Sequence, residues 1–255
     1  MRVITLNANG IRSAERRGFF DWARTQASDF VCLQETRAQE HQLPADAFVL
    51  PGFTGYFVDA KRRGYSGVAL YARSEPLEVR RLLGWDDVDS EGRFIQADFG
   101  EFTVSSLYVP SGISGPVRQA FKMNFLERLL AMLAQLRRSG REHIVCGDFN
   151  VAHRDADTYS PARNRHVTGF LPEERAWMDT LLERVGWVDA FRVVNPEPKQ
   201  YTWWSNWPGA WERNLGWRID YQIITPGLAG RVRRASIYKE ARFSDHAPLT
   251  IEYDL

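Results

Sequence analysis

Carboxylates and amides directly follow three short apolar runs of the sequence. Asn7 and Asn9 follow the first run, Glu35 follows the second, and Asp148 and Asn150 follow the third. Any one of them alone is more typical of a turn residue or a helix cap, because such side chains bond to nearby backbone. Their joint occurrence favours a shared site. Oxygen ligands of this kind suit Mg²⁺, which takes one or two carboxylates together with water and substrate phosphate.

Two further polar groups border apolar runs in the C-terminal part of the chain. Asp245 and His246 precede the last run, and Asp220 opens another. A histidine that Asp220 orients could serve as a general base or contact a phosphate, and a structural histidine with satisfied hydrogen bonds is the alternative. Asp148 and Asn150 occupy alternate positions, so their side chains point to the same side if that segment is extended.

Five of the nine tryptophans gather in one segment, at positions 203, 204, 207, 211 and 217. Core packing is the usual fate of tryptophan. The residues between them are polar or, like Pro208 and Gly209, typical of loops, so we expect some of the rings to lie at the surface. Flat aromatic faces beside cationic residues suit a base, a sugar or an unstacked nucleotide.

Lysines and arginines form short clusters at 12–17, 61–63, 163–165 and 231–234. These clusters are either solvated surface charge or a ring that binds phosphates around the acidic centre. The formal net charge of the chain is only +1, which does not by itself indicate a polyanionic partner. Any basic surface must therefore be local.

Apolar runs of four to six residues alternate with segments of helical period, which predicts an α/β fold. We expect strands at 2–6, 30–33, 67–71, 102–109, 143–146, 220–224 and 249–253. The clearest helix spans 117–138, where apolar residues recur every three or four positions, and a second spans 172–185 behind Pro172. The polar segment 160–168 is the best candidate for a functional loop.

The composition is that of an ordinary globular protein, with 255 residues, 44% hydrophobic and 25% charged. It excludes a chain too polar to fold. No uninterrupted apolar stretch approaches a membrane span and no signal-peptide pattern opens the chain, so we expect a soluble, cytoplasmic protein without a membrane partner. Cys32 and Cys146 lie inside apolar runs, which indicates buried thiols in a reducing compartment. No linker interrupts the chain, which favours one domain over 1–255.

Taken together, these motifs resemble the exonuclease III family of Mg²⁺-dependent abasic-site endonucleases, within the wider endonuclease/exonuclease/phosphatase superfamily. The segments that carry the resemblance are LNANGIR (6–12), LQETR (33–37), GYSGVA (64–69), YVP (108–110), CGDFNVAH (146–153), GF (169–170), YTWW (201–204), GWRIDY (216–221) and FSDHAP (243–248). The resemblance implies a four-layer α/β sandwich, in which two packed mixed β-sheets are flanked by helices. It also implies incision of duplex DNA 5′ to abasic sites, with 3′-to-5′ exonuclease and 3′-end-cleaning activity, in base excision repair.

The resemblance also assigns roles residue by residue. The metal ligands it implies, for Mg²⁺ or for Mn²⁺ as a substitute, are Asn7, Glu35, Asp148, Asn150, Asp245 and His246, with Glu35 foremost. The catalytic residues are Tyr108, Asp148, Asn150, Asp220 and His246, of which Asp148 positions or deprotonates the attacking water and Asn150 steadies the charge that develops on the phosphorane. The substrate-binding residues are Tyr65, Asn164, Trp203, Trp217 and Ile219, and the last three match a pocket for a flipped-out baseless deoxyribose.

One departure from the family pattern and one main rival bear on this assignment. Many relatives have an asparagine two residues before the Gly-Phe pair, where this chain has Val167, which leaves open the balance among incision, 3′-end cleaning and exonuclease activity. The rival is a catalytically silent regulator of the same fold, of the catabolite repression control type, in which key acids are replaced. Because the acids and His246 are all present here, we expect catalysis. A superfamily phosphatase fits less well, and a monomer is expected because the substrate is a long rigid duplex.

Overall fold

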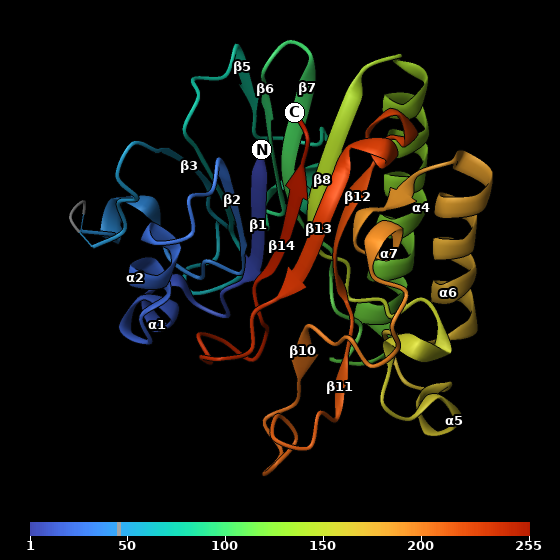
Figure 1. Cartoon of the computed structure of the whole chain (residues 1–255). Helices are drawn as coiled ribbons and strands as arrows, with labels where there is room; N and C mark the ends of the chain where they lie inside the picture. Colours follow the sequence, from blue (N-terminus) through green and yellow to red (C-terminus); the bar gives the residue numbers. More distant parts are fainter. Residues whose placement is uncertain (45–46) are drawn as a thin grey trace.

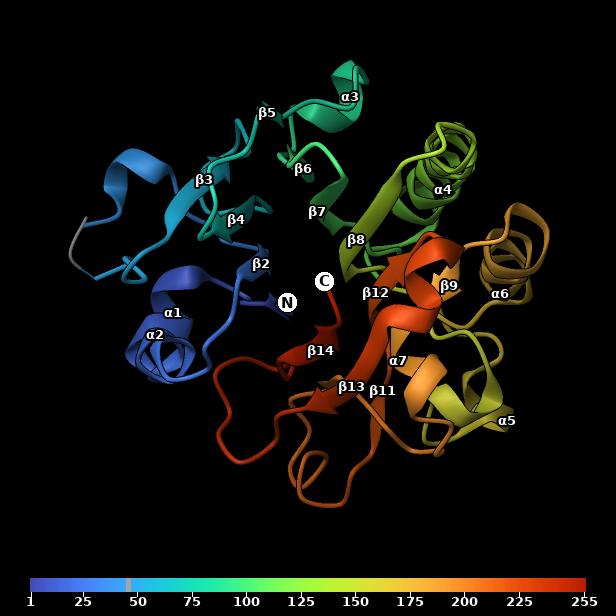
Figure 2. The same cartoon turned by 45° about the horizontal axis from the view of Figure 1, so that its top comes forward.

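The computed structural model describes residues 1–44 and 47–255. Over these residues, two six-stranded sheets pack face to face, and helices cover the outer face of each (Figures 1 and 2). Both sheets are mixed, because β1 runs parallel to β2 and β7 parallel to β8 while the other neighbours are antiparallel. The predicted four-layer sandwich is confirmed.

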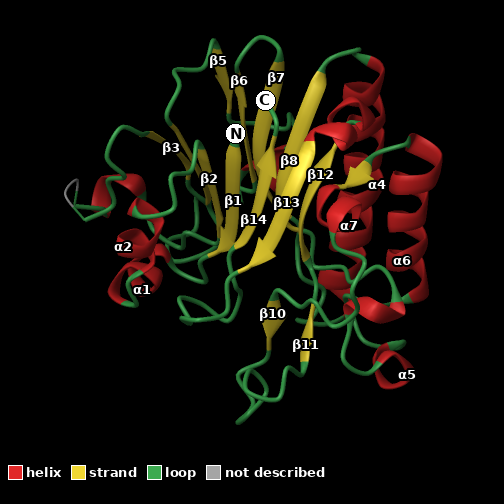
Figure 3. Cartoon of the chain, in the orientation of Figure 1, coloured by secondary structure: helices red, strands yellow, loops and turns green. Residues whose placement is uncertain are grey.

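The strands of the first sheet are, in spatial order, β13 (Val232–Ile237), β14 (Leu249–Tyr253), β1 (Arg2–Asn7), β2 (Phe30–Gln34), β4 (Val68–Ala72) and β3 (Thr54–Val58). Those of the second are β5 (Glu78–Arg80), β6 (Phe94–Asp98), β7 (Phe102–Tyr108), β8 (Glu142–Asp148), β12 (Asp220–Ile224) and β9 (Val188–Asp189). A short ribbon of β10 (Trp203–Trp204) and β11 (Gly216–Trp217) projects below them in Figure 3.

The helices are α1 (Ile11–Arg16), α2 (Phe19–Arg24), α3 (Asp86–Asp89), α4 (Pro116–Arg138), α5 (Pro161–Asn164), α6 (Pro172–Asp179) and α7 (Ala190–Val194). Short 3₁₀ turns cover Glu40–Gln42, Asp155–Asp157 and Pro226–Arg231, and a π-helical turn covers Thr180–Val185. In Figure 2, α1 and α2 lie on the side of β1 to β4, and α4 and α6 lie on the side of β8 and β12.

The central strands are buried on both faces, which explains why they read as continuous apolar runs. Along β8, Ile144 and Cys146 face the layer between the two sheets, whereas Val145 packs beneath α4 and α6. Cys32 of β2 lies in the same inner layer as Cys146. Both thiols are free and buried, as the sequence predicted. None of the helices within residues 1–44 and 47–255 combines the length and apolar character needed to cross a membrane.

All seven strands expected from apolar runs are present; 220–224 and 249–253 have the expected bounds, and the other five differ by one or two residues at an end. The strands that the expectation omitted include edge strands such as β5 and β13, where about half of the side chains face water. On β13, Arg233 and Arg234 are exposed, a charge pattern that protects an edge from further pairing. Both expected helices are also present, and the second changes from α-helix to π-helix after Asp179. Helix α5 occupies part of the segment that was expected to be a loop.

His143, near the start of β8, is a buried histidine that the fold holds neutral. Its Nδ1 lies 2.8 Å from the Thr103 hydroxyl and its Nε2 lies 3.0 Å from the Ser139 hydroxyl. Burial, together with nearby Arg141, lowers the pKa of His143 below its ordinary value. The unfolded chain therefore binds a proton at His143 that the folded chain does not, in the window just below pH 6.5.

We expect the free energy of unfolding to fall more steeply for the wild type than for His143→Gln as the pH drops from 7 to 5, because the neutral glutamine carries no such protonation linkage. Denaturant unfolding at several pH values measures both slopes. Equal slopes for the two proteins would show that His143 titrates alike in both states.

Candidate active site

Strand register brings the polar strand ends together at one edge of the sandwich, from which β10 and β11 project in Figure 1. Asp148, the last residue of β8, lies opposite Tyr108 of β7 on one side and Asp220 of β12 on the other. Gly147 permits the close approach of β7, since a Cβ there would lie 1.9 Å from the Leu107 carbonyl oxygen. Three residues far apart in the chain are thus adjacent because of sheet pairing.

A cavity of about 530 Å³ opens at this edge, within the usual size range of ligand sites. The predicted site residues that line it are Glu35, Tyr65, Tyr108, Asp148, Asn150, Trp203, Trp217, Ile219, Asp245 and His246. Asn7 and Asp220 are fully buried and contact lining residues from behind. Asn164 is not among the lining residues; its Nδ2 donates to Thr158 Oγ1 at 2.6 Å, which holds α5 against the preceding segment.

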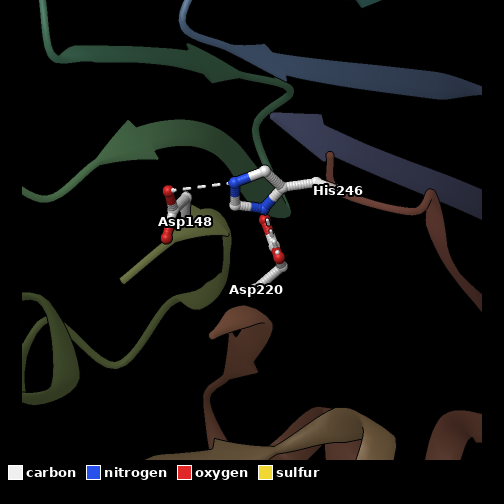
Figure 4. A group of neighbouring side chains, drawn as sticks. All are labelled: Asp148, Asp220 and His246. Atoms are coloured by element: carbon white, nitrogen blue, oxygen red, sulfur yellow. Dashed lines mark hydrogen bonds and ion pairs between the residues drawn. The ribbon is translucent and has the colours of Figure 1, made fainter. Parts of the chain in front are cut away.

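At the floor of the cavity, His246 lies between two carboxylates (Figure 4). Its Nδ1 lies 2.9 Å from Asp220 Oδ2, and its Nε2 lies 3.9 Å from Asp148 Oδ2. Asp220 thus orients the ring as the sequence predicted, and Nε2 is directed toward Asp148. All three side chains are nearly inaccessible to solvent, so their charges act on one another in a medium of low polarity.

Burial and neighbouring charges shift the pKa values of Asp148 and His246. Burial raises the pKa of Asp148 to about 7, against the opposing effect of His246. Burial alone would lower the pKa of His246, but the Asp220 and Asp148 carboxylates outweigh it and raise that pKa. The cavity floor can therefore hold a cationic imidazole beside a carboxyl group that takes up a proton near neutral pH. Shifted groups of this kind in a cavity are typical of a catalytic site.

Asn7 links the carboxylates of two strands. Its Nδ2 donates to Glu35 Oε1 at 2.8 Å and to Asp148 Oδ2 at 2.9 Å, and its Oδ1 accepts the backbone N–H of Asn9 at 2.9 Å. The second oxygen of Glu35 accepts a hydrogen bond from Arg37 Nε at 2.8 Å. Asp245 lies nearby, held by Asn9 Nδ2 at 2.8 Å.

Asn150 fixes the Asp148 carboxylate from the chain segment that follows it. The Asn150 backbone N–H donates to Asp148 Oδ1 at 2.8 Å, and its Nδ2 donates to Asp148 Oδ2 at 3.1 Å and to the Val109 carbonyl at 2.9 Å. Asn150 adopts a left-handed backbone conformation, with φ of 51°. The chain turns at Asn150, and this turn directs the Asn150 side chain back at Asp148. The two side chains were expected to share one side of an extended segment, and the segment is not extended.

Left-handed backbone at non-glycine residues concentrates around the cavity. Within the described residues, such conformations occur at Asn9, Ala27, Glu35, Arg37, Ser66, Asn150, Lys199 and Asn214, and four of these line the cavity: Asn9, Glu35, Arg37 and Asn150. Strained backbone of this kind persists where the surrounding structure enforces it, commonly at functional sites. The conformations turn the polar side chains at the strand ends into the cavity.

Two arginines that the sequence analysis did not select form a wall of the cavity. Arg93 is buried, with its guanidinium carbon 4.5 Å from the centroid of the Tyr108 ring. Arg93 and Arg118 both donate to the Tyr65 hydroxyl, at 3.1 Å and 2.8 Å, and Glu91 pairs with both. The predicted clusters of basic residues do not line the cavity, where the arginines are Arg37, Arg93 and Arg118. A charged residue directly before the buried strand β6 was the available signal for Arg93.

Tyr108 stands between this wall and the acids. Burial, together with the Glu35 and Asp148 carboxylates, raises the pKa of Tyr108 well above its ordinary value. The phenol therefore keeps its proton at neutral pH and is available as a hydrogen-bond donor.

The opposite wall is aromatic. Trp203 and Trp217 pair across β10 and β11 with their rings 6.3 Å apart in an edge-to-face arrangement, and Ile219 packs in the same apolar cluster. Trp203 Nε1 also donates to Asp245 Oδ2 at 3.1 Å, which joins the aromatic wall to the acids. Trp207 is 76% exposed, so the expectation that some of these rings lie at the surface is confirmed.

Behind the aromatic wall lies a buried ionic network. Arg218, between Trp217 and Ile219, turns away from the cavity and pairs with Asp157 and Asp189, each at 2.8 Å. Although burial acts in the opposite direction, Arg218 lowers the pKa of Asp157. Arg192 also pairs with Asp157, at 2.6 Å, so Arg218 is one of two arginines beside Asp157 and is the arginine that pairs with Asp189.

We expect Arg218→Met to destabilise the protein by about 3–5 kcal/mol, because it leaves the buried Asp189 carboxylate without its arginine and removes one of the two arginines beside Asp157. For a chain of this size, that corresponds to a decrease of roughly 6–20 °C in Tm. Calorimetry measures the change. Arg128→Met is the matched control, since it removes the more exposed pair with Asp87, and a similar decrease for both variants would contradict the assignment.

A two-sheet α/β sandwich that gathers acids and one histidine at the strand ends defines the DNase I-like class of folds. The chain belongs to the Endonuclease/Exonuclease/phosphatase family, whose model matches residues 4–246. It is 37% identical to an exodeoxyribonuclease of Bacillus subtilis (strain 168), over 98% of both chains, and 36% identical to the DNA repair nuclease APEX1 of Danio rerio, over 98% of this chain and 81% of that one.

The structure agrees with these sequence comparisons. It is similar to the AP endonuclease from Archaeoglobus fulgidus, with a TM-score of 0.90, 31% identity and full coverage of both chains. The prediction of an exonuclease III-type member of the family is therefore confirmed.

Proposed function

We propose that the protein is a Mg²⁺-dependent DNA-repair nuclease that hydrolyses the phosphodiester bond 5′ to abasic sites in duplex DNA. The same site would trim blocked 3′ ends and digest DNA from 3′ to 5′, in base excision repair. The names of the similar proteins support this proposal. The observation that carries it is the Asp148 carboxylate 3.9 Å from an Asp220-oriented imidazole, in a cavity with one aromatic wall.

In the proposed reaction, a water molecule attacks the phosphorus, and the bond from phosphorus to the 3′-oxygen breaks. The 3′-oxygen leaves with the bonding electron pair and takes a proton from solvent to become the 3′-hydroxyl. Asp148 accepts the proton of the water, which its pKa near 7 permits at neutral pH. His246, cationic beside Asp220, holds the scissile phosphate through Nε2. Tyr108 keeps its proton and donates a hydrogen bond to the reacting phosphate. The role of Asn150 in steadying the developing charge stays a prediction; its observed contacts orient Asp148.

The donor set around the cavity fits a hard divalent cation. Two groups of donors are present. Ligand atoms of Asp148, Asp220 and His246 lie within 4.8 Å of one another, and Asp220 Oδ1 is buried without a hydrogen-bond partner. The carboxylates of Glu35 and Asp245 line the cavity, and Asn7 contacts Glu35 from behind. Because His246 already pairs with Asp220, we place Mg²⁺ at Glu35, with Asn7 and Asp245 beside it; Mn²⁺ is the expected substitute. The chemistry that the ion supplies when bound is neutralisation of phosphate charge.

The aromatic wall supports selection of abasic nucleotides. Trp203, Trp217 and Ile219 offer apolar contact to a deoxyribose, and an abasic nucleotide is easier to extrude from the duplex than a paired one. Val167, 42% exposed at the rim, adds apolar surface where many relatives of the exonuclease III type have an asparagine. On this proposal the protein acts as a monomer, one domain over 1–255, in the cytoplasm or on the nucleoid.

A denaturing-gel time course on two end-labelled duplexes tests the proposal. One duplex carries a stable abasic-site analogue and the other is undamaged with a recessed 3′ end, and each is incubated with Mg²⁺ or with EDTA. We expect one Mg²⁺-dependent cut 5′ to the lesion. The ladder of shortened products from the undamaged duplex measures the 3′-to-5′ exonuclease activity relative to incision. If the folded protein cleaves neither duplex with any of several metals, the silent-regulator alternative takes its place.

A further inference from the structure

A buried ion pair joins the two long helices behind the cavity. Lys122 of α4 and Glu174 of α6 have side chains that are 1% and 0% exposed, with Nζ 2.5 Å from Oε1. Burying two charges is costly, and the pair is not the sole link between these helices, because Trp177 Nε1 also donates to the Leu126 carbonyl at 2.6 Å. Holding α4 and α6 together is therefore not a sufficient reason for two charged side chains to be buried there.

Gln119 Nε2 of α4 also donates to Glu174 Oε1, at 3.0 Å, and the remaining contacts of the pair lead to the two loops that border the cavity. Lys122 Nζ donates to the backbone carbonyl of Asn150 at 2.7 Å. Glu174 Oε2 accepts the backbone N–H of Gly169 at 2.6 Å and that of Leu171 at 3.0 Å. One charge thus holds the loop after β8, and the other holds the loop before α6.

The two loops are also in contact with each other at the cavity. A Cβ on Gly169, which has φ of 94°, would lie 3.2 Å from both the Asn150 carbonyl oxygen and the Trp217 ring. Asn150 is itself left-handed, and its backbone N–H and Nδ2 both hold Asp148. Lys122 therefore binds the peptide whose conformation aims Asn150 at Asp148.

We propose that Lys122 and Glu174 are positioning residues for the nuclease reaction, which hold Asn150 and Gly169 so that Asp148 and Trp217 keep their relative placement. The inference rests on the proposed function. Neither residue lines the cavity, so neither contacts substrate. A small misplacement of reacting groups can cost on the order of 10²-fold in rate. Loss of the pair should therefore lower kcat more than it raises KM.

Three variants separate positioning from simple stability. Lys122→Met removes the donor to Asn150, and Glu174→Gln keeps the shape while weakening the hold on both Lys122 and the Gly169 loop. Trp177→Phe is the matched control, because it removes the hydrogen bond from Trp177 to the Leu126 carbonyl and keeps an aromatic ring beside Phe149 of the first loop. Kinetics on the abasic duplex should show kcat lowered about 10-fold or more in the first two variants, with KM changed less than about threefold and kcat nearly unchanged in the control.

Amide hydrogen exchange followed by NMR tests the same inference without turnover. We expect Glu174→Gln to speed exchange at the Gly169 and Leu171 amides, and Trp177→Phe to leave both protected. Folded Lys122→Met and Glu174→Gln proteins with wild-type kcat would overturn the inference, as would an equal kcat loss in Trp177→Phe. If the wild type itself does not cleave, the proposed function fails. Hydrogen exchange at the Gly169 amide then tests by itself whether Glu174 holds this loop.

Discussion

Asp148→Asn should lower kcat about 10²- to 10⁴-fold, the range expected when a general base is removed. Asparagine keeps the size of the side chain and one oxygen to accept from Asn7 or Asn150, but it cannot take a proton from water. Single-turnover cleavage of the abasic duplex measures the loss. Asp155→Asn, which changes an exposed acid, is the control and should retain full activity.

The same substitution should leave the fold intact and make it less sensitive to pH. Because burial raises the pKa of Asp148 to about 7, the folded chain binds more protons there than the unfolded chain between about pH 4 and 7. The stability that this proton binding contributes is fully present below about pH 4 and is lost as the pH rises to about 7. In EDTA, the free energy of unfolding of Asp148→Asn relative to the wild type should therefore be more favourable at pH 8 than at pH 4. If the difference in unfolding free energy between Asp148→Asn and the wild type is the same at both pH values, burial does not raise the pKa of Asp148.

Glu35→Ala should abolish Mg²⁺-dependent cleavage, with kcat at or below that of Asp148→Asn. Glu35 is the carboxylate that lines the cavity, accepts from Asn7 and faces Arg37, and the proposed metal position depends on it. Its loss should also remove the increase in Tm that Mg²⁺ produces in the wild type, because a cation stabilises only the state that binds it. Thermal unfolding with Mg²⁺ and with EDTA measures this effect independently of activity.

Glu91→Gln is the matched control for Glu35→Ala. Glu91 is a partly buried carboxylate near the same cavity, but it pairs with Arg93 and Arg118 rather than with the acids. The Mg²⁺-dependent rise in Tm should persist in this variant. A Glu35→Ala protein with wild-type cleavage, or with an unchanged response to Mg²⁺, would show that the metal is held elsewhere.

Much of the fold could be predicted because its central strands are buried on both faces. β4 is apolar at every position and β8 is apolar at its centre, from Ile144 to Cys146, which produces the continuous runs that mark these strands in the sequence. Edge strands such as β13 alternate or carry charge, and their sequence signal is correspondingly weak. The long helix α4 was equally evident, because its buried residues recur at helical spacing.

The sequence predicted the types of residue at the site, but it identified only some of the residues that line the cavity. Acids that follow apolar runs indicated the cavity floor, and ten of the predicted residues line the cavity. Arg93 was missed because its place directly before an apolar run is a weak signal, and Arg118 was missed because an arginine within a helical pattern has no marker of where it points. The role of Asn164 in substrate binding stays a prediction, and the structure shows its contact with Thr158.

The amino-acid sequence by itself determined the α/β class, the principal strands and the chemical types of the groups at their ends, since these depend on local periodicity and on residue identity. Only the tertiary structure decided that Asp148 faces Asp220 across a strand pair and that His246 lies between them. It likewise placed Lys122 and Glu174 behind the same loops. These neighbours are remote in the chain, and strand register and helix packing, which arise from the burial of the whole core, bring them together.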